Sequence, residues 1–336
     1  MKTKCCLISA FFISVSVWAT PLNISNIRSL LDNAPIVVSG YVSNIRSTTN
    51  TPALYGYPSG SNIKLLIATI DIGVVYKGEL NATPIDIYFM QAHDDEKAFP
   101  RIDNGLAYIV TINATDNGMI LSDPQNGIIP VDNNAFDKSL RDSKKIEDVF
   151  KYSLSSTNED IIVSSLLALA YLNATDCDSL IEAKYSSQSI EIRLAAATAS
   201  VMLGKWEKCT DIIAIWEARS IGENGFTGFH NHNLSTASWA AIKGITNKDA
   251  FPVISKLLQA SYNTHIIRTL IQALAQSNDD HYIKGVMPYI EHQDKQVSYD
   301  AYVTIMRLLN RPIVTPEKYN MGKRAIINEI KSSIAN

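Results

Sequence analysis

The sequence predicts an α+β multidomain protein, in which a small N-terminal β-barrel or sandwich precedes a C-terminal α-solenoid of helix pairs. In the first part of the chain, apolar and polar residues alternate as they do in half-buried strands. In the second half, apolar residues recur at the i, i+3, i+4, i+7 spacing of amphipathic helices. Five small residues there are separated by 28, 45, 32 and 28 positions, which is typical of stacked helical hairpins with one insertion: Ala168, Ala196, Ala241, Ala273 and Ala301.

The composition excludes several classes of protein. The 336 residues are 46% hydrophobic and 19% charged, which is too apolar for a disordered chain. The formal net charge is −3, whereas sequence-independent binding of nucleic acid requires a clustered basic surface. We therefore expect folded domains and no nucleic-acid partner.

Residues 1–19 have the three-part pattern of a secretory signal peptide. Lys2 and Lys4 precede an apolar run over 5–17, and residues 17–19 form a cleavage site. The run is shorter than a membrane-spanning helix requires. We expect cleavage near Thr20, a periplasmic or secreted location, and no membrane span afterwards; an uncleaved anchor is the alternative.

Residues 20–135 are predicted to form the β domain. A short amphipathic helix ends at Asn33, because Pro35 follows. Strands are expected where one set of alternating positions is apolar, giving a sheet with one buried face. Gly118, after Asp116 and Asn117, supplies the positive φ of a tight hairpin turn. The apolar sets are Val38/Val42, Leu66/Ala68/Ile70/Ile72/Val74, Ile85/Ile87/Phe89 and Leu106/Tyr108/Val110/Ile112.

The β region resembles the OB-like netrin domain of the metalloproteinase-inhibitor family. The similar segments are 36–42, 74–78 and 105–110. The resemblance implies a small barrel. That family's inhibitory N-terminal cysteine has no counterpart here, because no cysteine lies between Cys6 and Cys177. Its mode of protease inhibition is therefore not implied.

The rest of the chain divides into a connecting helix or linker over 136–156 and about five helix pairs over 157–336. Segments 190–197 and 266–275 resemble bacterial HEAT-like (armadillo-type) repeats. Arg193 and Arg268 occupy the basic position of such repeats, and Ser298 departs from it. The resemblance implies an α-solenoid that binds proteins.

Two loops carry the candidate binding residues. The insertion at 220–233 is rich in glycine and contains Phe226, Phe229, His230 and His232. Exposed aromatic residues on a rigid array are typical of protein contacts, although both phenylalanines could instead cover the gap between repeats. Tyr55 and Tyr57, within the 52–62 loop, are candidates for a second contact edge.

Two cysteines remain after removal of the leader. In an oxidising compartment, Cys177 and Cys209 are candidates for a disulfide; two buried free thiols are the alternative. The pair His230 and His232 has no third ligand at a suitable spacing, so no metal is expected. The acidic segment 278–281 is expected to cap a helix.

The sequence contains no recognisable catalytic motif. We therefore expect a non-catalytic, exported protein without a cofactor, whose partner is another protein. In its most specific form, the hypothesis is an inhibitor or immunity-type protein that occludes a partner enzyme. The alternatives are an envelope scaffold or assembly factor, and a hydrolase whose site forms only on folding.

Overall fold

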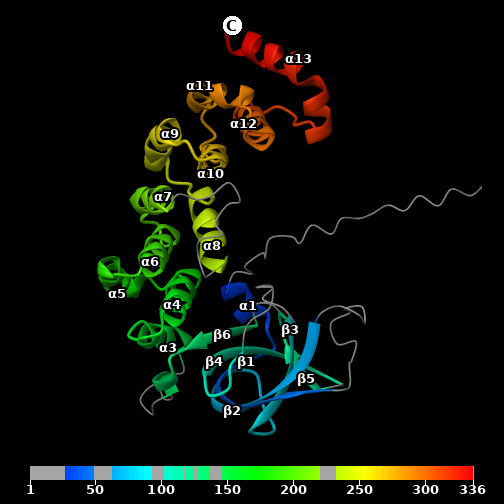
Figure 1. Ribbon diagram of the computed structural model, residues 1–336, viewed down its shortest axis with the longest axis vertical. Helices are drawn as coiled ribbons and strands as arrows, with labels where there is room; N and C mark the ends of the chain where they lie inside the picture. Colours follow the sequence, from blue (N-terminus) through cyan, green and yellow to red (C-terminus); the bar gives the residue numbers. More distant parts are fainter. Residues whose placement is uncertain are drawn as a thin grey trace, which may run out of the picture.

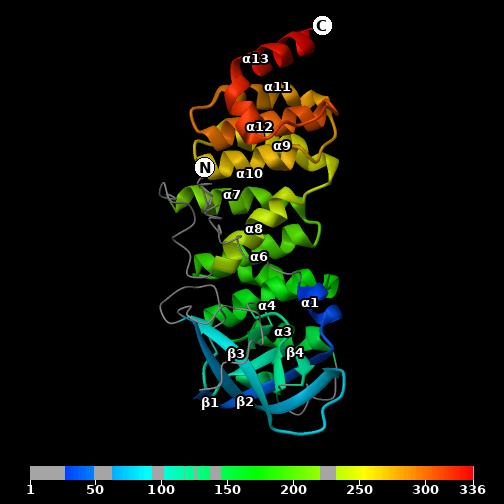
Figure 2. The same ribbon diagram turned by 90° about the vertical axis from the view of Figure 1, so that its right-hand side faces the viewer.

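The computed structural model describes residues 27–48, 63–92, 102–116, 118–124, 127–136, 145–219 and 232–335. It contains an N-terminal β-barrel followed by a long array of helices, as the sequence predicts (Figure 1). Seen from the side, the helices stack in layers away from the barrel, and the C-terminus lies at the far end (Figure 2).

Six strands form the sheet, and the first five of them close into the barrel. Their order is β1-β2-β3-β5-β4-β6, and an additional pairing of β1 with β4 closes the sheet. All pairs are antiparallel except β3 with β5. The bounds are α1 (Ile27–Asn33), β1 (Ile36–Ser47), β2 (Ile63–Lys77), β3 (Ile85–Ala92), β4 (Ala107–Thr115), β5 (Gly118–Leu121) and β6 (Ile128–Val131).

The residues predicted to alternate between apolar and polar supply the core of the barrel. Val38, Ile70, Ile87, Phe89 and Val110 all belong to one buried cluster inside the barrel. The expected hairpin turn lies between β4 and β5, where Thr115 pairs with Gly118. Gly118 has φ +122°, and a Cβ at this position would lie 2.8 Å from the Tyr88 ring. Glycine is therefore required there by both conformation and space.

The expectation of a single buried face is wrong for the strands beside the helices. Ile109 and Val110 are neighbours on β4, and both are fully buried. Val110 points into the barrel, whereas Ile109 belongs to the core of the helical array. Val37 on β1 and Val131 on β6 likewise belong to the core of the helical array. Helices cover the outer face, so these strands have nearly continuous apolar sequences.

The helical array begins after a short 3₁₀ turn at Asn133–Phe136. Its helices are α3 (Ile146–Ser153), α4 (Glu159–Tyr171), α5 (Asp178–Glu182), α6 (Ile190–Met202), α7 (Cys209–Ala218), α8 (His232–Lys243), α9 (Phe251–Ala260), α10 (Thr264–Leu274), α11 (Ile283–Val286), α12 (Lys295–Leu308) and α13 (Pro316–Ala335), with short 3₁₀ turns between several of them.

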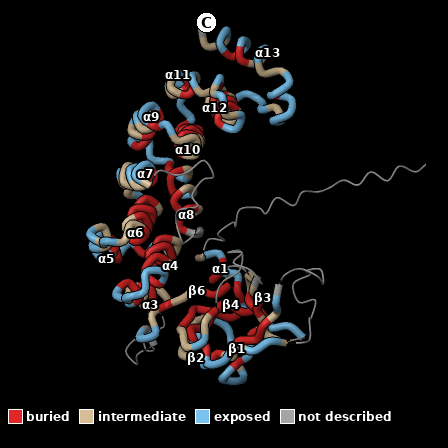
Figure 3. The backbone as a smooth tube through the Cα atoms, in the orientation of Figure 1, coloured by how far each residue is buried: buried red, intermediate tan, exposed pale blue. Residues whose placement is uncertain are grey.

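The helices form two layers. The inner helices α4, α6, α8, α10 and α12 pack one against the next. The outer helices α5, α7, α9 and α11 form a second layer along one side of the inner helices (Figure 1). The inner helices are the more deeply buried (Figure 3). Each inner helix contributes one of the five alanines with the predicted spacing, and all five are buried. The small residues thus allow successive helices to approach closely.

Side chains at the start of the inner helices fix where those helices begin. Asn158, Ser189, Asn263 and Asp294 each accept a hydrogen bond from a backbone N–H of the first turn. Such caps satisfy donors that a helix cannot pair internally. The inner helices therefore begin at positions set by local sequence.

The barrel and the helices are joined by one hydrophobic core rather than by an exposed linker. Within the segment predicted as a connection, α3 buries Val149 and Phe150 in the cluster that also contains Ile109 and Val131. The backbone N–H of Asp132 donates to Ser153 Oγ at 3.0 Å. Docking of α3 therefore sets the position of the first repeat relative to the barrel.

None of the described helices combines the length and apolar character that crossing a membrane requires.

Candidate functional site

The inner helices α8, α10 and α12 form a groove near their C-terminal ends. Its volume is about 470 Å³, within the size range of ligand sites. We call it the inner groove. Its lining residues are Lys243 of α8, Gln272 and Gln276 of α10 and the turn after it, Tyr299, Asp300, Val303, Thr304 and Arg307 of α12, and Ile313 of the following loop.

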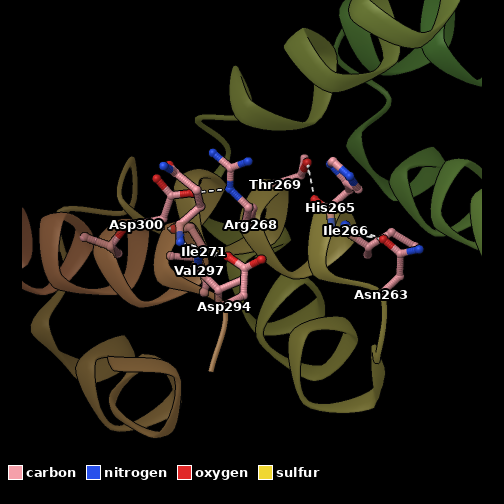
Figure 4. A network of polar contacts seen from close by, with 11 residues as sticks. Asn263, His265, Ile266, Arg268, Thr269, Ile271, Asp294, Val297 and Asp300 are labelled. Carbon is pink, nitrogen blue, oxygen red and sulfur yellow. Dashed lines mark hydrogen bonds and ion pairs between the residues drawn. The ribbon is translucent and has the colours of Figure 1, made fainter. Parts of the chain in front are cut away.

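An ion pair links two neighbouring repeats at this groove. Arg268 Nε donates to Asp300 Oδ2 at 2.7 Å, and the two side chains are 27% and 14% exposed. Figure 4 shows Arg268 reaching from α10 toward Asp300 on α12. Because both side chains are partly buried, each needs the other as a partner. The pair fixes the polar surface between the two repeats.

Lys243 adds a second cation from the preceding repeat. Its Nζ lies 5.2 Å from the centre of the Trp239 ring. Burial and the charge of Arg268 lower the pKa of Lys243, and Asp300 acts in the opposite direction. The charged groups of three successive repeats therefore influence one another here.

Arg307 is a third cation, in the last turn of α12. None of the ion pairs between described residues involves Arg307 or Lys243. Both lie in the last turn of their helices, where a cation complements the helix dipole. Neither has a carboxylate partner among the described residues.

The groove also has amide and apolar groups. The amides of Gln272 and Gln276 make no hydrogen bond with other described residues. Val303 and the exposed Ile313 supply apolar surface. Tyr299 is held in place because its hydroxyl donates to the carbonyl of Val314 at 2.9 Å. The groove thus combines positive charge, amides and an apolar wall.

A second hollow, of about 440 Å³, is lined by the loop at 277–280. Its polar groups serve local structure: Asp279 Oδ1 accepts from the N–H of His281 at 2.9 Å, and Asn278 has a left-handed backbone with φ 50°. The expected capping role of this acidic segment is thereby confirmed.

Most of the predicted binding residues lie outside the described part of the chain. These are Phe226, Phe229, His230, Tyr55 and Tyr57. His232 is the first residue of α8, and its side chain is not described. Their role in binding stays a prediction. Among the described residues, no group of three His, Cys, Asp or Glu side chains could hold a metal ion.

The predicted disulfide between Cys177 and Cys209 is not formed, and both cysteines are buried free thiols. Cys177 Sγ donates instead to the carbonyl of Ala174 at 2.6 Å. The two residues lie at the start of outer helices of successive repeats, α5 and α7. Burial raises the pKa of Cys177 and raises that of Cys209 to about 11.

The predicted binding residues do not include those of the groove, because the aromatic residues of the two loops are the more conspicuous candidates in the sequence. A signal was present, however: Arg268, Gln272 and Gln276 are spaced by four, as are Tyr299, Val303 and Arg307. Residues at this spacing share one helix face. Such stripes beside the buried alanines indicate the open face of an inner helix. Of the two basic residues singled out in the repeats, Arg268 pairs with Asp300 of the groove, whereas Arg193 donates to the carbonyl of Ser187.

No family model matches the chain, and no curated protein matches it. Solved structures do. One is a chain in the complex of CpcE and CpcF of phycocyanin lyase from Nostoc sp. PCC7120, with 16% identity and a TM-score of 0.37. That match covers 50% of this chain and 66% of the other, slightly less than two thirds of its length. Another is an engineered protein, with 16% identity, a TM-score of 0.30, and coverage of 52% and 83%.

The prediction that the chain is not an enzyme is corrected by this comparison. The chain matched first belongs to a lyase complex. The similarity itself assigns no activity to this chain.

Proposed function

We propose that this chain is an exported protein that binds another protein on the inner face of its helical repeats. The inner groove is the observation that carries the proposal: three repeats contribute to it, and it presents cations and amides that are not satisfied by other described residues. Groups of this kind are favourable where a partner completes them.

The union of barrel and helices supports a two-part binding surface. Because Val131, Ile109 and Phe150 share one core, the barrel is held in a fixed position beside the first repeat. A preorganised surface binds at a lower entropic cost than a flexible one. We propose that the barrel is OB-like, which the parallel β3–β5 pair and the β1–β4 closure support. The loop residues Phe226 and Phe229 remain candidate anchors.

In its most specific form, the proposal is an inhibitor or immunity-type protein that occludes a partner enzyme in the periplasm or outside the cell. An envelope scaffold is the alternative. Export is supported by the signal-peptide pattern of residues 1–19. N-terminal sequencing of the protein recovered from the envelope fraction tests it, and we expect the mature chain to begin near Thr20.

Partner binding is tested by cross-linking capture from an envelope extract, followed by a titration with the purified partner. The variant is Lys243→Glu, in the inner groove. The matched control is Lys256→Glu, on an exposed position of the outer helix α9. We expect the control to bind the partner like the unchanged protein and Lys243→Glu to lose it. Equal binding by both variants would contradict the proposal.

A Phe226→Ser/Phe229→Ser variant tests the insertion separately. If this variant no longer binds the same partner, the loop is part of the surface that contacts the partner. Retention of that partner removes the loop from the proposal and leaves the inner groove in it.

A further inference from the structure

Within the proposed function, we propose that the inner groove binds an extended, acidic peptide segment of the partner protein. The inference rests on the proposed function and specifies the chemistry of the partner. It follows from the charge, the spacing and the shape of the groove.

The local charge differs in sign from that of the whole chain. Two cations, Lys243 and Arg307, and one carboxylate, Asp300, line the groove, whereas the chain has a formal charge of −3. Asp300 is already engaged by Arg268 at 2.7 Å. Two cations therefore remain for a ligand, and a ligand with carboxylates complements them.

The helix dipoles stabilise these cations only in part and leave Lys243 without a hydrogen-bond acceptor among the described residues. A cation in the last turn is stabilised by the nearby carbonyl groups. Lys243 is half-buried, however, and its packing against Trp239 gives its ammonium group no hydrogen-bond acceptor. A carboxylate placed in the groove supplies that acceptor.

The two glutamines match an extended backbone. Gln272 lies in α10 and Gln276 in the turn that follows it, four positions further along, a separation that spans about 6 Å in a continuous helix. Alternate residues of an extended chain repeat every ~6.6–6.8 Å. Each amide can both donate and accept, so the two can bond successive peptide groups on one edge of a strand. A peptide parallel to α10 is thus favoured over a compact anion.

The apolar residues of the groove indicate which other side chains the ligand should carry. Val303 and Ile313 lie beside Arg307, and Ile313 is 41% exposed. Apolar groups of the ligand can cover them and remove this surface from water. A segment that alternates acidic and apolar residues meets both requirements.

The test uses the mature full chain and fluorescein-labelled peptides, with binding followed by fluorescence anisotropy. The probe is an acetylated hexapeptide of alternating Glu and Leu, and its counterpart has Gln in place of Glu. We expect the Glu peptide to bind about tenfold more tightly than the Gln peptide, and its affinity to fall as salt rises from 50 to 200 mM, because the contact is ionic. Equal affinity for the two peptides would overturn the proposal.

Variants locate the site. Lys243→Gln and Arg307→Glu should each weaken binding of the Glu peptide about tenfold, while Lys256→Glu on α9 should leave it unchanged. Arg307 is exposed, so that variant tests the site even if Lys243→Gln disturbs folding, which circular dichroism would show. An effect of Lys256→Glu equal to that of the groove variants would show diffuse attraction and overturn the proposal.

Citrate distinguishes a peptide site from a site for small anions. Displacement of the peptide by citrate at a concentration equal to that of the peptide would overturn the proposal in favour of a small-anion site. The two proposals can fail separately. If Lys243→Glu abolishes binding of the partner but the protein shows no preference for the acidic peptide, the proposed function stands and only this inference is refuted.

Discussion

Replacing Ile109 by alanine tests whether the barrel and the helices fold as one unit. Ile109 is fully buried on β4 and belongs to the core shared with α3 and α4. Truncation of a buried isoleucine to alanine costs about 2–5 kcal/mol, because contacts are lost and a cavity remains. We expect the free energy of unfolding of the whole chain to fall by that amount.

Tryptophan fluorescence makes the test specific. The sequence has four tryptophans, of which Trp18 lies in the predicted signal peptide and the other three, Trp206, Trp216 and Trp239, lie in the helical repeats. Tryptophan fluorescence of a chain that begins at Thr20 therefore reports on the helices, whereas the substitution is in the barrel. With a urea m-value of about 3 kcal/mol/M, the midpoint should move down by about 1 M.

The control is Val75→Ala, at a barrel position that is 38% exposed. A surface substitution of this kind changes stability by less than about 0.5 kcal/mol, so the midpoint should hardly move. If Ile109→Ala leaves the tryptophan midpoint at the value of the unchanged protein, the shared core does not couple the two parts, and the reasoning is refuted.

Three further predictions concern the turn, a cap and a titrating side chain. Gly118→Ala should cost about 1–3 kcal/mol, measured by urea denaturation, because alanine opposes the positive φ and its Cβ meets Tyr88; an unchanged midpoint would contradict this. Asp294→Ala should lower stability by about 1 kcal/mol, because α12 loses its cap; Asp294→Asn should recover most of it. Burial, and then the charge of Arg268, lower the pKa of His265. The unfolded chain therefore takes up this proton at a higher pH than the folded chain, and stability should fall as pH drops below about 6.5 and through the folded pKa. His265→Gln should reduce that pH dependence, and identical pH profiles for the two proteins would refute the assignment.

Much of the architecture could be predicted because it depends on local pattern. Alternation specified the inward set Val38, Ile87 and Val110, since successive residues of a strand face opposite sides. The alanine spacing specified the inner helices, because only small residues allow close packing at each step. The hairpin at Gly118 followed from turn chemistry alone.

The candidate site could not be predicted in the same way, because it depends on which helix faces meet. Arg268 and Asp300 are 32 positions apart, and only the stacking of α10 on α12 brings them to 2.7 Å. The sequence of α12 does not show that its polar stripe borders a groove shared with Lys243 of α8.

The sequence by itself determined the elements, their order and the faces that must be buried, because these follow from the periods of strand and helix. Tertiary structure decided the rest. It packed α3 and α4 against β6, the neighbour of β4, and so made Ile109 part of the core that joins barrel and helices. It also held Cys177 and Cys209 as separate thiols. The packing of elements that are far apart in the sequence, which no local pattern encodes, determines both outcomes.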